Sequence, residues 1–269
     1  MSEILKKKML TEKYFKENIK YKIINNKFIF QELAFTEMED TLDLLKSKFK
    51  KFSRIYSWLI RFLSPVFESG EQKRFISNNV DKDAMILNVG SGNSKILENI
   101  CNVDIFAYDK VDVVCDISDL PFLDNSIDVV FNSAVLEHVP NPQKVVDEIY
   151  RVLKKNGVIY SAFPFMQGFH ASPYDFTRVT EEGIKVLHKD FELIEVKPFG
   201  GPTSGMLWVF QEWIAILFSF GSKKLHLFIY LLVMIITAPI KFLDFVLIKH
   251  PMAKNISSGF VYIGRKNGV

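Results

Sequence analysis

The stretch that most constrains the fold runs from Met85 to Gly92 and reads Met-Ile-Leu-Asn-Val-Gly-Ser-Gly. Its first five residues form a mostly apolar run, short enough for a buried parallel strand, which stops at two glycines. Glycine lets the backbone turn tightly and approach a ligand that a Cβ atom would hold away. We expect a helix from Ser94 to about residue 100, with its first N–H groups directed at the same turn. Strand, Gly-x-Gly turn and helix together predict the start of a nucleotide-type site in a doubly wound α/β fold.

The chain after this stretch alternates short apolar runs with helical patterns, which predicts a parallel sheet with right-handed crossovers. The predicted strands cover residues 104–108, 112–115, 127–132, 158–163 and 191–197, with a closing strand at 258–265. The predicted helices cover residues 142–153 and 180–188. Near the N-terminus, two β-prone runs on either side of Asn25 and Asn26 predict a small hairpin within residues 21–30.

Polar side chains follow three of these predicted strands. Asp109 lies 19 residues after Gly90 and ends the second strand, where a carboxylate can accept both hydroxyls of a ribose. Asp116 ends the third strand, and Ser133 follows the fourth. Because the carboxyl ends of parallel strands meet at one edge of a sheet, we expect these groups to surround one ligand.

At this point the sequence resembles a known family, the class I S-adenosylmethionine-dependent methyltransferases of the small-molecule, type 11 kind. The resemblance covers roughly residues 80–200 and the last strand. It is carried by residues 86–92 (Ile-Leu-Asn-Val-Gly-Ser-Gly), Asp109, 116–122 (Asp-Ile-Ser-Asp-Leu-Pro-Phe), 126–130 (Ser-Ile-Asp-Val-Val), 134–139 (Ala-Val-Leu-Glu-His-Val) and 148–157 (Glu-Ile-Tyr-Arg-Val-Leu-Lys-Lys-Asn-Gly). It implies a Rossmann-like α/β fold, in which a seven-stranded methyltransferase sheet is mostly parallel and its last strand is antiparallel.

The resemblance also implies S-adenosylmethionine as the cofactor and a role for each matching residue. Residues 90–92 (Gly90, Ser91 and Gly92) would pack against its methionine and ribose parts, and Asp109 would bind the ribose hydroxyls. Asp116 would bind the adenine amino group, Ile117 the adenine ring, and Ser133 would lie near the methionine end.

Two positions depart from the family pattern. The strand residue that is usually acidic is Asn88, which can form a hydrogen bond but offers no charge to the ammonium group of the cofactor. Ser94 replaces the third glycine of the usual loop, and Lys95 occupies the position at which a nicotinamide-binding Gly-x-Gly-x-x-Gly loop would have glycine. A dehydrogenase is therefore disfavoured, and a catalytically inactive module that kept the fold stays open.

Residues after the fourth strand narrow the function further. Nucleic-acid amino-methyltransferases carry an Asn/Asp-Pro-Pro-aromatic motif there, whereas residues 132–135 read Asn-Ser-Ala-Val, so we expect no nucleic-acid partner. Glu137 and His138 resemble part of the metal-binding patch of quinone O-methyltransferases, but the further acidic ligand expected at position 134 is Ala134. We therefore expect no metal ion and a structural role for His138.

The segment after the fifth strand, residues 169–180, resembles a His…Pro-x-Asp-x-x-Arg-x-Thr loop of methyltransferases near glycan and lipid modification. Methyl transfer needs in-line approach and removal of the acceptor proton. The predicted catalytic residues are His170, whose ordinary pKa suits a base, with Asp175 and Arg178. Alternatively, Asp175 and Arg178 form an ion pair that fixes the loop, or the whole segment is structural.

Charge and apolar residues are unevenly distributed along the chain. Residues 1–62 contain 14 Lys and Arg against 8 Asp and Glu, and the pattern over residues 37–63 predicts an amphipathic helix with a basic face. Between the sixth and seventh strands, where this fold normally has a tight hairpin, residues 205–248 contain only five charged side chains. We divide the chain into an N-terminal hairpin and basic helix (1–66) and a methyltransferase domain (67–269) with an apolar helical insert (201–257).

The combined prediction is a methyltransferase bound to the cytoplasmic face of a membrane, with the insert as a helical hairpin lying in or dipping into one leaflet. Its acceptor would be a small or lipid-linked molecule, such as a glycan-lipid or a quinone-like lipid. The alternatives are a soluble enzyme whose insert is a lid or dimer surface, and a true transmembrane hairpin. The two cysteines, Cys101 and Cys115, form no disulfide framework or metal-binding spacing, which agrees with a reducing compartment. The sequence gives no oligomeric state.

Overall fold

The structure is a computed structural model that describes residues 10–30, 62–67, 70–81, 83–94, 96–171 and 173–268. Its strands are β1 (Lys22–Ile24), β2 (Lys27–Ile29), β3 (Ile86–Val89), β4 (Ile100–Asp104), β5 (Val113–Val114), β6 (Ile127–Ser133), β7 (Leu153–Pro164), β8 (Phe191–Phe199) and β9 (Gly259–Lys266). The α-helices are α4 (Glu71–Asn79), α5 (Pro142–Val152), α6 (Glu181–Leu187), α7 (Pro202–Ser219), α8 (Lys223–Thr237) and α9 (Asp244–Leu247). Short 3-10 helices are η1 (Glu12–Tyr14), η3 (Leu136–His138), η4 (Ala238–Leu243) and η5 (Ala253–Asn255).

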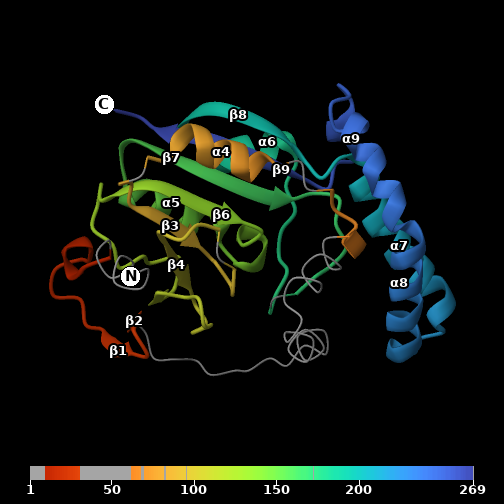
Figure 1. Ribbon diagram of the computed structural model, residues 1–269, viewed down its shortest axis with the longest axis horizontal. Helices are drawn as coiled ribbons and strands as arrows, with labels where there is room; N and C mark the ends of the chain where they lie inside the picture. Colours follow the sequence, from red (N-terminus) through yellow and green to blue (C-terminus); the bar gives the residue numbers. More distant parts are fainter. Residues whose placement is uncertain are drawn as a thin grey trace.

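All the described strands join one sheet in the order β1-β2-β5-β4-β3-β6-β7-β9-β8 (Figure 1). From β5 to β7 the neighbouring strands are parallel, and β9 runs antiparallel between β7 and β8. This arrangement confirms the predicted Rossmann-like methyltransferase sheet with an antiparallel last strand. The carboxyl ends of β3, β4, β5, β6 and β7 lie at one edge of the sheet, which is where an open α/β sheet binds its ligand.

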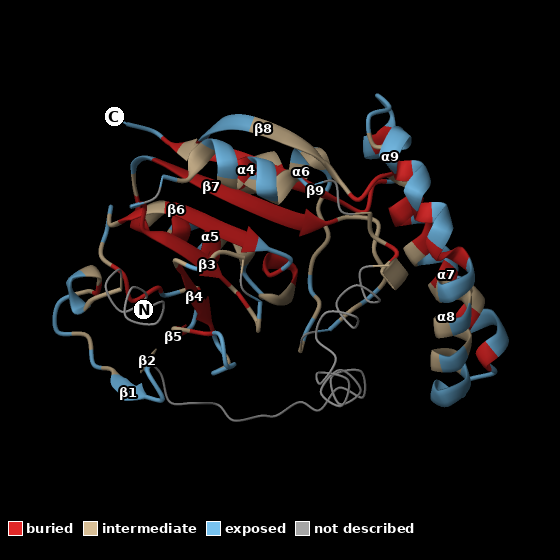
Figure 2. Ribbon diagram, viewed as in Figure 1, coloured by how far each residue is buried: buried red, intermediate tan, exposed pale blue. Residues whose placement is uncertain are grey.

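Apolar side chains cover both faces of the sheet. One buried cluster joins Phe75 of α4 to β3, β6, β7 and β9, and the other joins Val145 and Ile149 of α5 and Ile184 of α6 to the opposite face. β3, β4, β5, β6, β7 and β9 are buried along most of their length, whereas β1 and most of β8 are not (Figure 2). Asn141 and Thr180 cap α5 and α6 with side-chain hydrogen bonds, which explains why the helices begin close to the predicted positions.

The region after the glycine turn differs from the prediction. The described residues between Gly92 and Ile100, which are 93–94 and 96–99, form turns and bends rather than a helix. The next strand is β4, which begins four residues earlier than the predicted strand at 104–108. Asn102 and Asp104 interrupt the apolar pattern of this strand, yet both are buried. Asn102 receives a hydrogen bond from Asn88 on the neighbouring strand and donates to the Lys110 carbonyl, so a polar residue is accommodated inside the sheet. The predicted helix from Ser94 to about residue 100, with N–H groups directed at the glycine turn, is therefore wrong.

The predicted N-terminal hairpin is confirmed and extends the sheet. Asn25 and Asn26 both have positive φ, as a two-residue type I′ turn requires. β2 then pairs in parallel with β5, and Phe15 packs against Phe122 in the main core. The predicted basic helix over residues 37–63 lies outside the described residues except for its last two.

The insert forms a helical arm that projects from the end of the sheet (Figure 1). α7 and α8 pack against each other, and η4 and α9 continue α8 back to the domain. The arm joins the domain through buried polar contacts. Asp244 accepts hydrogen bonds from the backbone N–H groups of Thr203 and Ser204 at the start of α7, and Lys241 donates to the Ser64 carbonyl.

Candidate active site

The glycine turn at the end of β3 is shaped by close contacts. Gly90 has φ of 69°, and its N–H group and that of Ser91 both donate to the Val103 carbonyl. A Cβ atom on Gly90 would lie 2.3 Å from Val135 Cγ1, so only glycine fits. Gly92 also has positive φ, but the space around it is open. The turn thus offers backbone next to free space, as the sequence predicted.

Asp104 is the carboxylate at the end of β4. Its Oδ2 accepts the Gly92 N–H group at 2.7 Å and its Oδ1 accepts the Phe106 N–H group at 3.0 Å. Burial raises the pKa of Asp104, and these N–H groups oppose the rise. Asp109, which the sequence placed at this strand end, lies instead in an exposed turn, where its backbone carbonyl accepts a hydrogen bond from Lys27.

The other predicted cofactor residues lie at the same edge. Asp116 follows β5 and is exposed, with one carboxylate oxygen fixed by the Ser118 N–H group, while Ile117 is buried beside it. Ser133 ends β6 and is exposed. Asn88 differs, because its side chain bonds Asn102 inside the sheet and therefore supports the edge from below.

The turn after β6 is strained. Ala134 has φ of 55°, a left-handed conformation that costs a non-glycine residue roughly 1–2 kcal/mol. Its N–H group donates to the Ala162 carbonyl of β7, which holds the turn in place. The next residues form η3, which carries Glu137 and His138 back over the strand ends.

The predicted catalytic loop is held by a network centred on Asp175. The Asp175 carboxylate forms a bidentate ion pair with Arg178 and accepts the His170 backbone N–H group at 2.8 Å. Burial raises the pKa of Asp175, but the Arg178 guanidinium and the His170 N–H group outweigh it and lower the pKa overall. This confirms the ion pair that the sequence left as one alternative. Asp175 and Arg178 therefore orient the loop that carries His170.

Three side chains from two segments meet beside this loop. Glu137, His138 and His170 bring one possible ligand atom each to within 4.8 Å of one another. Glu137 is fully buried, and the Nε2 atoms of both histidines lie 3.7 Å from its Oε1. The neighbouring Glu137 carboxylate raises the pKa of His170, while burial opposes the rise. On the far side of the loop, the His170 ring packs against Trp208 of α7.

Sequence reasoning missed two of these groups. The apolar pattern does not single out Asp104, because the strand that it ends contains polar residues. Its place at the end of a possible strand at 100–104 was a usable signal. The sequence indicates Glu137 as a metal ligand only together with an acidic residue at position 134, which is absent. Nothing local in the sequence shows that His170, 33 residues later, folds back onto Glu137.

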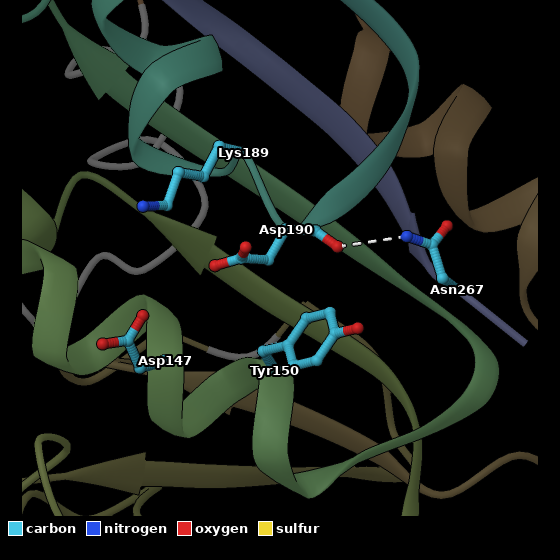
Figure 3. Close-up of a pocket in the computed structure, with 5 residues that line it drawn as sticks. All are labelled: Asp147, Tyr150, Lys189, Asp190 and Asn267. Atoms are coloured by element: carbon cyan, nitrogen blue, oxygen red, sulfur yellow. Dashed lines mark hydrogen bonds between the residues drawn. The ribbon is translucent and has the colours of Figure 1, made fainter. Parts of the chain in front are cut away.

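A separate depression lies at the other edge of the sheet. It is lined by Asp147 and Tyr150 of α5, by Lys189 and Asp190 before β8, and by Asn267 after β9 (Figure 3). The Asn267 side chain donates to the Asp190 carbonyl at 3.4 Å. Its lining comes from the amino-terminal end of β8 and the end of β9, so it is remote from the strand ends that carry the predicted site.

Comparison with known proteins agrees with this geometry. Residues 87–161 match the profile of a family described as a methyltransferase domain. None of the curated proteins compared with the chain matches it.

Several solved structures are similar in fold. One is an S-adenosylmethionine-dependent methyltransferase from Methanosarcina mazei, with 17% identity over 72% of this chain and 97% of that chain and a TM-score of 0.43. Another is the 1,6-didemethyltoxoflavin-N1-methyltransferase of Burkholderia thailandensis, with 12% identity over 92% of this chain and 98% of that chain and a TM-score of 0.47. A third is the [4+2]-cyclase SpnF, with 14% identity over 73% and 80% and a TM-score of 0.49. At these values the similarity concerns the fold and not the substrate.

Residues 87–161 match a methyltransferase domain, and the sheet order and the glycine turn around them have the corresponding fold. The matched domain and the sheet together indicate an S-adenosylmethionine-dependent methyltransferase.

Proposed function

We propose that this enzyme works on a membrane surface and methylates a hydroxyl group of an amphipathic or lipid-linked acceptor on the cytoplasmic side. The observation that carries the proposal is the distribution of side chains on the helical arm formed by α7, α8 and α9. Unlike a helical hairpin of a soluble protein, the arm buries mostly small and polar side chains and exposes large apolar ones. The arm also contacts the loop that carries His170, so an acceptor held at the arm would lie beside the site.

The cofactor would lie at the carboxyl edge of the sheet, against backbone 90–92 and Ser133. The open space at Gly92 fits a ligand that approaches the backbone closely. We assign the ribose hydroxyls to Asp104 rather than to Asp109, because Asp104 is the carboxylate that ends a strand next to the glycine turn. Asp116 and Ile117 keep their predicted adenine contacts. The bound cofactor supplies an electrophilic methyl group on a sulfonium.

The arm buries small and polar residues and exposes large apolar ones. The buried residues of α7 are Thr203, Ser204, Gly205, Leu207, Gln211, Ala215 and Ser219. Its exposed residues include Met206, Val209, Phe210, Trp213, Ile216, Leu217 and Phe218. The two helices are joined by a buried hydrogen bond from Gln211 to Thr237 at 2.8 Å. Small residues and side-chain hydrogen bonds between helices, with apolar side chains outside, are typical of helices surrounded by lipid.

The second helix of the arm shows the same reversal. In α8, every residue of which is described, only Thr237 is buried. The helical run from Lys223 to Leu247 is long and apolar enough to cross a membrane, which by length and composition alone is weak evidence. Only 22% of its most apolar window is buried, however, whereas a core helix of a soluble protein is mostly buried. The apolar surface of the arm therefore needs another environment than this chain provides.

Charged residues flank the apolar stretch of the arm, with Lys223 and Lys224 before it and Lys241 and Asp244 after it. They favour an arm that lies along the membrane–water interface over one that spans the bilayer. Lys241 and Asp244 are buried against the domain, so the stretch of the arm without a formal charge between them and Lys224 is residues 225–240. Sixteen helical residues extend about 24 Å, less than the hydrocarbon core of about 30 Å. At the other end, exposed Lys223 and Lys224 would have to enter hydrocarbon if the arm dipped tip first.

The N-terminal segment supports the same orientation. Phe67 donates its N–H group to Ser204 of α7, and the Phe62 ring packs near Phe242 of η4. In the sequence, the basic stretch over residues 46–61 immediately precedes Phe62. Lysine and arginine side chains near an apolar surface strengthen binding to anionic lipids.

Removal of the acceptor proton falls to the side chains around His170. Asp175 and Arg178 position this residue, and Trp208 of α7 packs on its ring. Of the two ring nitrogens, Nδ1 is 2.9 Å from the Gly168 carbonyl, which leaves Nε2 as the atom that can take a proton. The predicted role of His170 as a base thus depends on Nε2, which faces Glu137.

Vesicle flotation tests the membrane proposal. Trp213 and Phe228 are 55% and 64% exposed on the outer faces of α7 and α8. Replacing both with Gln removes roughly 2–3 kcal/mol of apolar burial in lipid, and vesicle affinity should fall about 30- to 150-fold. The matched control is Val186→Gln with Leu193→Gln, two exposed apolar residues on the domain, which should leave flotation unchanged.

Two outcomes would contradict the proposal. A protein that stays in the aqueous fraction with anionic vesicles, and sediments as a dimer that the arm variant disrupts, has a dimer surface in place of a membrane surface. Flotation that is equal for the arm variant and the control variant would show that the arm is not the contact.

A further inference from the structure

We propose that Glu137, His138 and His170 bind a divalent transition-metal cation at the acceptor side of the active site. This inference deepens the proposed methyl transfer to a hydroxyl and rests on it. It also changes the prediction from sequence that the chain holds no metal ion.

The Glu137 carboxylate is the strongest indication of a missing partner. The residue has no exposed surface, and neither of its carboxylate oxygens has a hydrogen-bond partner among the described residues. Burying an unpaired carboxylate costs several kcal/mol. The histidine nitrogens at 3.7 Å are too far away to form hydrogen bonds with it. Something that binds carboxylate oxygen is therefore expected between these groups.

The tautomers of the two histidines favour a cation. His138 Nδ1 lies 2.6 Å from the Tyr174 carbonyl, and His170 Nδ1 lies 2.9 Å from the Gly168 carbonyl. A carbonyl only accepts, so both Nδ1 atoms carry the hydrogen, and in the neutral ring each Nε2 atom then has the lone pair that a cation needs. Metal-binding histidines are held in this way, with the second ring nitrogen donating to a backbone carbonyl or a carboxylate.

Arg178 does not disturb this assignment, although its Nη2 lies 3.2 Å from His170 Nδ1. The two hydrogens of Nη2 are directed to the Asp175 carboxylate at 2.6 Å and to the Gly168 carbonyl at 3.1 Å. No hydrogen is left for the ring nitrogen. The loop network therefore fixes the tautomer that leaves Nε2 free.

The spacing of the donors fits one cation. With ligand bonds of about 2.1 Å, two ligands of one metal lie about 3.4 Å apart at a tetrahedral angle and about 3.6 Å apart at 120°. Both nitrogen-to-Glu137 distances are 3.7 Å, and all three donor atoms lie within 4.8 Å of one another, so side-chain shifts on the order of 1 Å or less bring them around one cation. Two imidazoles and one carboxylate suit zinc and the neighbouring first-row divalent metals, and three protein ligands leave a position open.

The open position gives the site a role in the reaction. An acceptor hydroxyl bound there loses its proton more readily, because a bound cation lowers the pKa of a coordinated oxygen. The proton passes to water, a lone pair of the oxygen forms the new bond to the methyl carbon, and the electron pair of the broken carbon–sulfur bond stays on sulfur. With the cation bound, His170 acts as a ligand through Nε2, the same atom that can take the proton when no cation is bound.

Cobalt titration tests the site. The full-length protein in detergent is stripped with a chelator and titrated with Co²⁺, and the visible absorption of the ion is followed. We expect about one equivalent to bind with a spectrum of low coordination number, and Zn²⁺ to displace it. Glu137→Gln and His170→Gln should weaken Co²⁺ binding at least about 100-fold. His250→Gln, on an exposed histidine outside the site, is the matched control and should bind as the unchanged protein does.

S-adenosylmethionine binding, measured on the same samples, separates the possible failures. A protein that binds S-adenosylmethionine but gives no Co²⁺ spectrum overturns the metal site and leaves the proposed methyl transfer standing. Equal Co²⁺ affinity in Glu137→Gln and the control overturns the ligand assignment. Because Glu137→Gln keeps the size of the side chain, retained S-adenosylmethionine binding in this variant shows that it folds, and lost Co²⁺ binding then supports the site.

Discussion

The assignment of the ribose to Asp104 leads to a prediction that separates it from Asp109. In Asp104→Asn, the new amide nitrogen must face one of two backbone donors, the N–H groups of Gly92 and Phe106, which the carboxylate now accepts. The variant therefore loses a charged acceptor for the ribose and also disturbs the glycine turn. Asp109→Asn changes only an exposed turn side chain.

The size of the effect follows from hydrogen-bond energies. A hydrogen bond to a charged group contributes about 1.5–3 kcal/mol, and a buried donor without an acceptor costs about 1–3 kcal/mol. Losing the charged acceptor therefore weakens S-adenosylmethionine binding about 10- to 150-fold, and the unpaired donor lowers the free energy of unfolding. Asp109→Asn should bind within about twofold of the unchanged protein, since surface changes usually stay within about 0.5 kcal/mol.

Isothermal titration calorimetry with S-adenosylmethionine measures both variants, and circular dichroism checks that each is folded. Loss of binding in Asp109→Asn with normal binding in Asp104→Asn would refute the reasoning from the strand end. If both folded variants bind normally, the carboxyl edge around β4 does not hold the ribose.

Three further predictions concern the fold around the site. Gly90→Ala should abolish S-adenosylmethionine binding, because the new Cβ atom would lie 2.3 Å from Val135 Cγ1. Adding Val135→Ala removes this clash and should restore part of the stability but not all, because φ at position 90 stays positive. Full recovery would mean that backbone conformation does not matter there. Burial lowers the pKa of His188 to about 4 from an ordinary 6.5. The unfolded chain therefore binds a proton before the folded protein does, and the free energy of unfolding should fall by roughly 2.5 kcal/mol between about pH 7.5 and pH 4.5. His188→Phe should lack this part of the pH dependence in urea unfolding, and an unchanged slope would contradict it. Asp244→Asn should lower the hydrogen-exchange protection of the Thr203 and Ser204 amides about 100-fold, because one of the two loses its buried acceptor. Unchanged protection would show that the arm is fixed by other contacts.

The sheet could be predicted from the sequence because its elements carry local signals. β3, β6, β7 and β9 each contain a mostly apolar run, at residues 85–89, 127–131, 158–163 and 260–263. Asn141 and Thr180 precede α5 and α6 and form capping hydrogen bonds. The Asn25-Asn26 turn likewise requires positive φ, which asparagine tolerates. Such features depend on near neighbours in the chain and can be read without the fold.

The errors came from tertiary contacts. β4 was placed four residues late because Asn102 is polar, and its burial is possible only through Asn88 on the adjacent strand. The meeting of Glu137 with His170 depends on the loop that Asp175 and Arg178 hold, and no periodicity shows it. The sequence shows that residues 205–248 are mostly apolar, but it does not show which face of each helix is buried. The exposure of the large apolar side chains of the arm could therefore not be predicted.

The most direct test of the central account is to locate the transferred methyl group. The full-length protein is bound to vesicles made from a total lipid extract of its own organism and is given methyl-labelled S-adenosylmethionine, with Asp104→Asn as the control. The account predicts label in the lipid-soluble fraction with the unchanged protein and little with Asp104→Asn. Label only in water-soluble products, or no label from a protein that binds S-adenosylmethionine and floats with the vesicles, would contradict it.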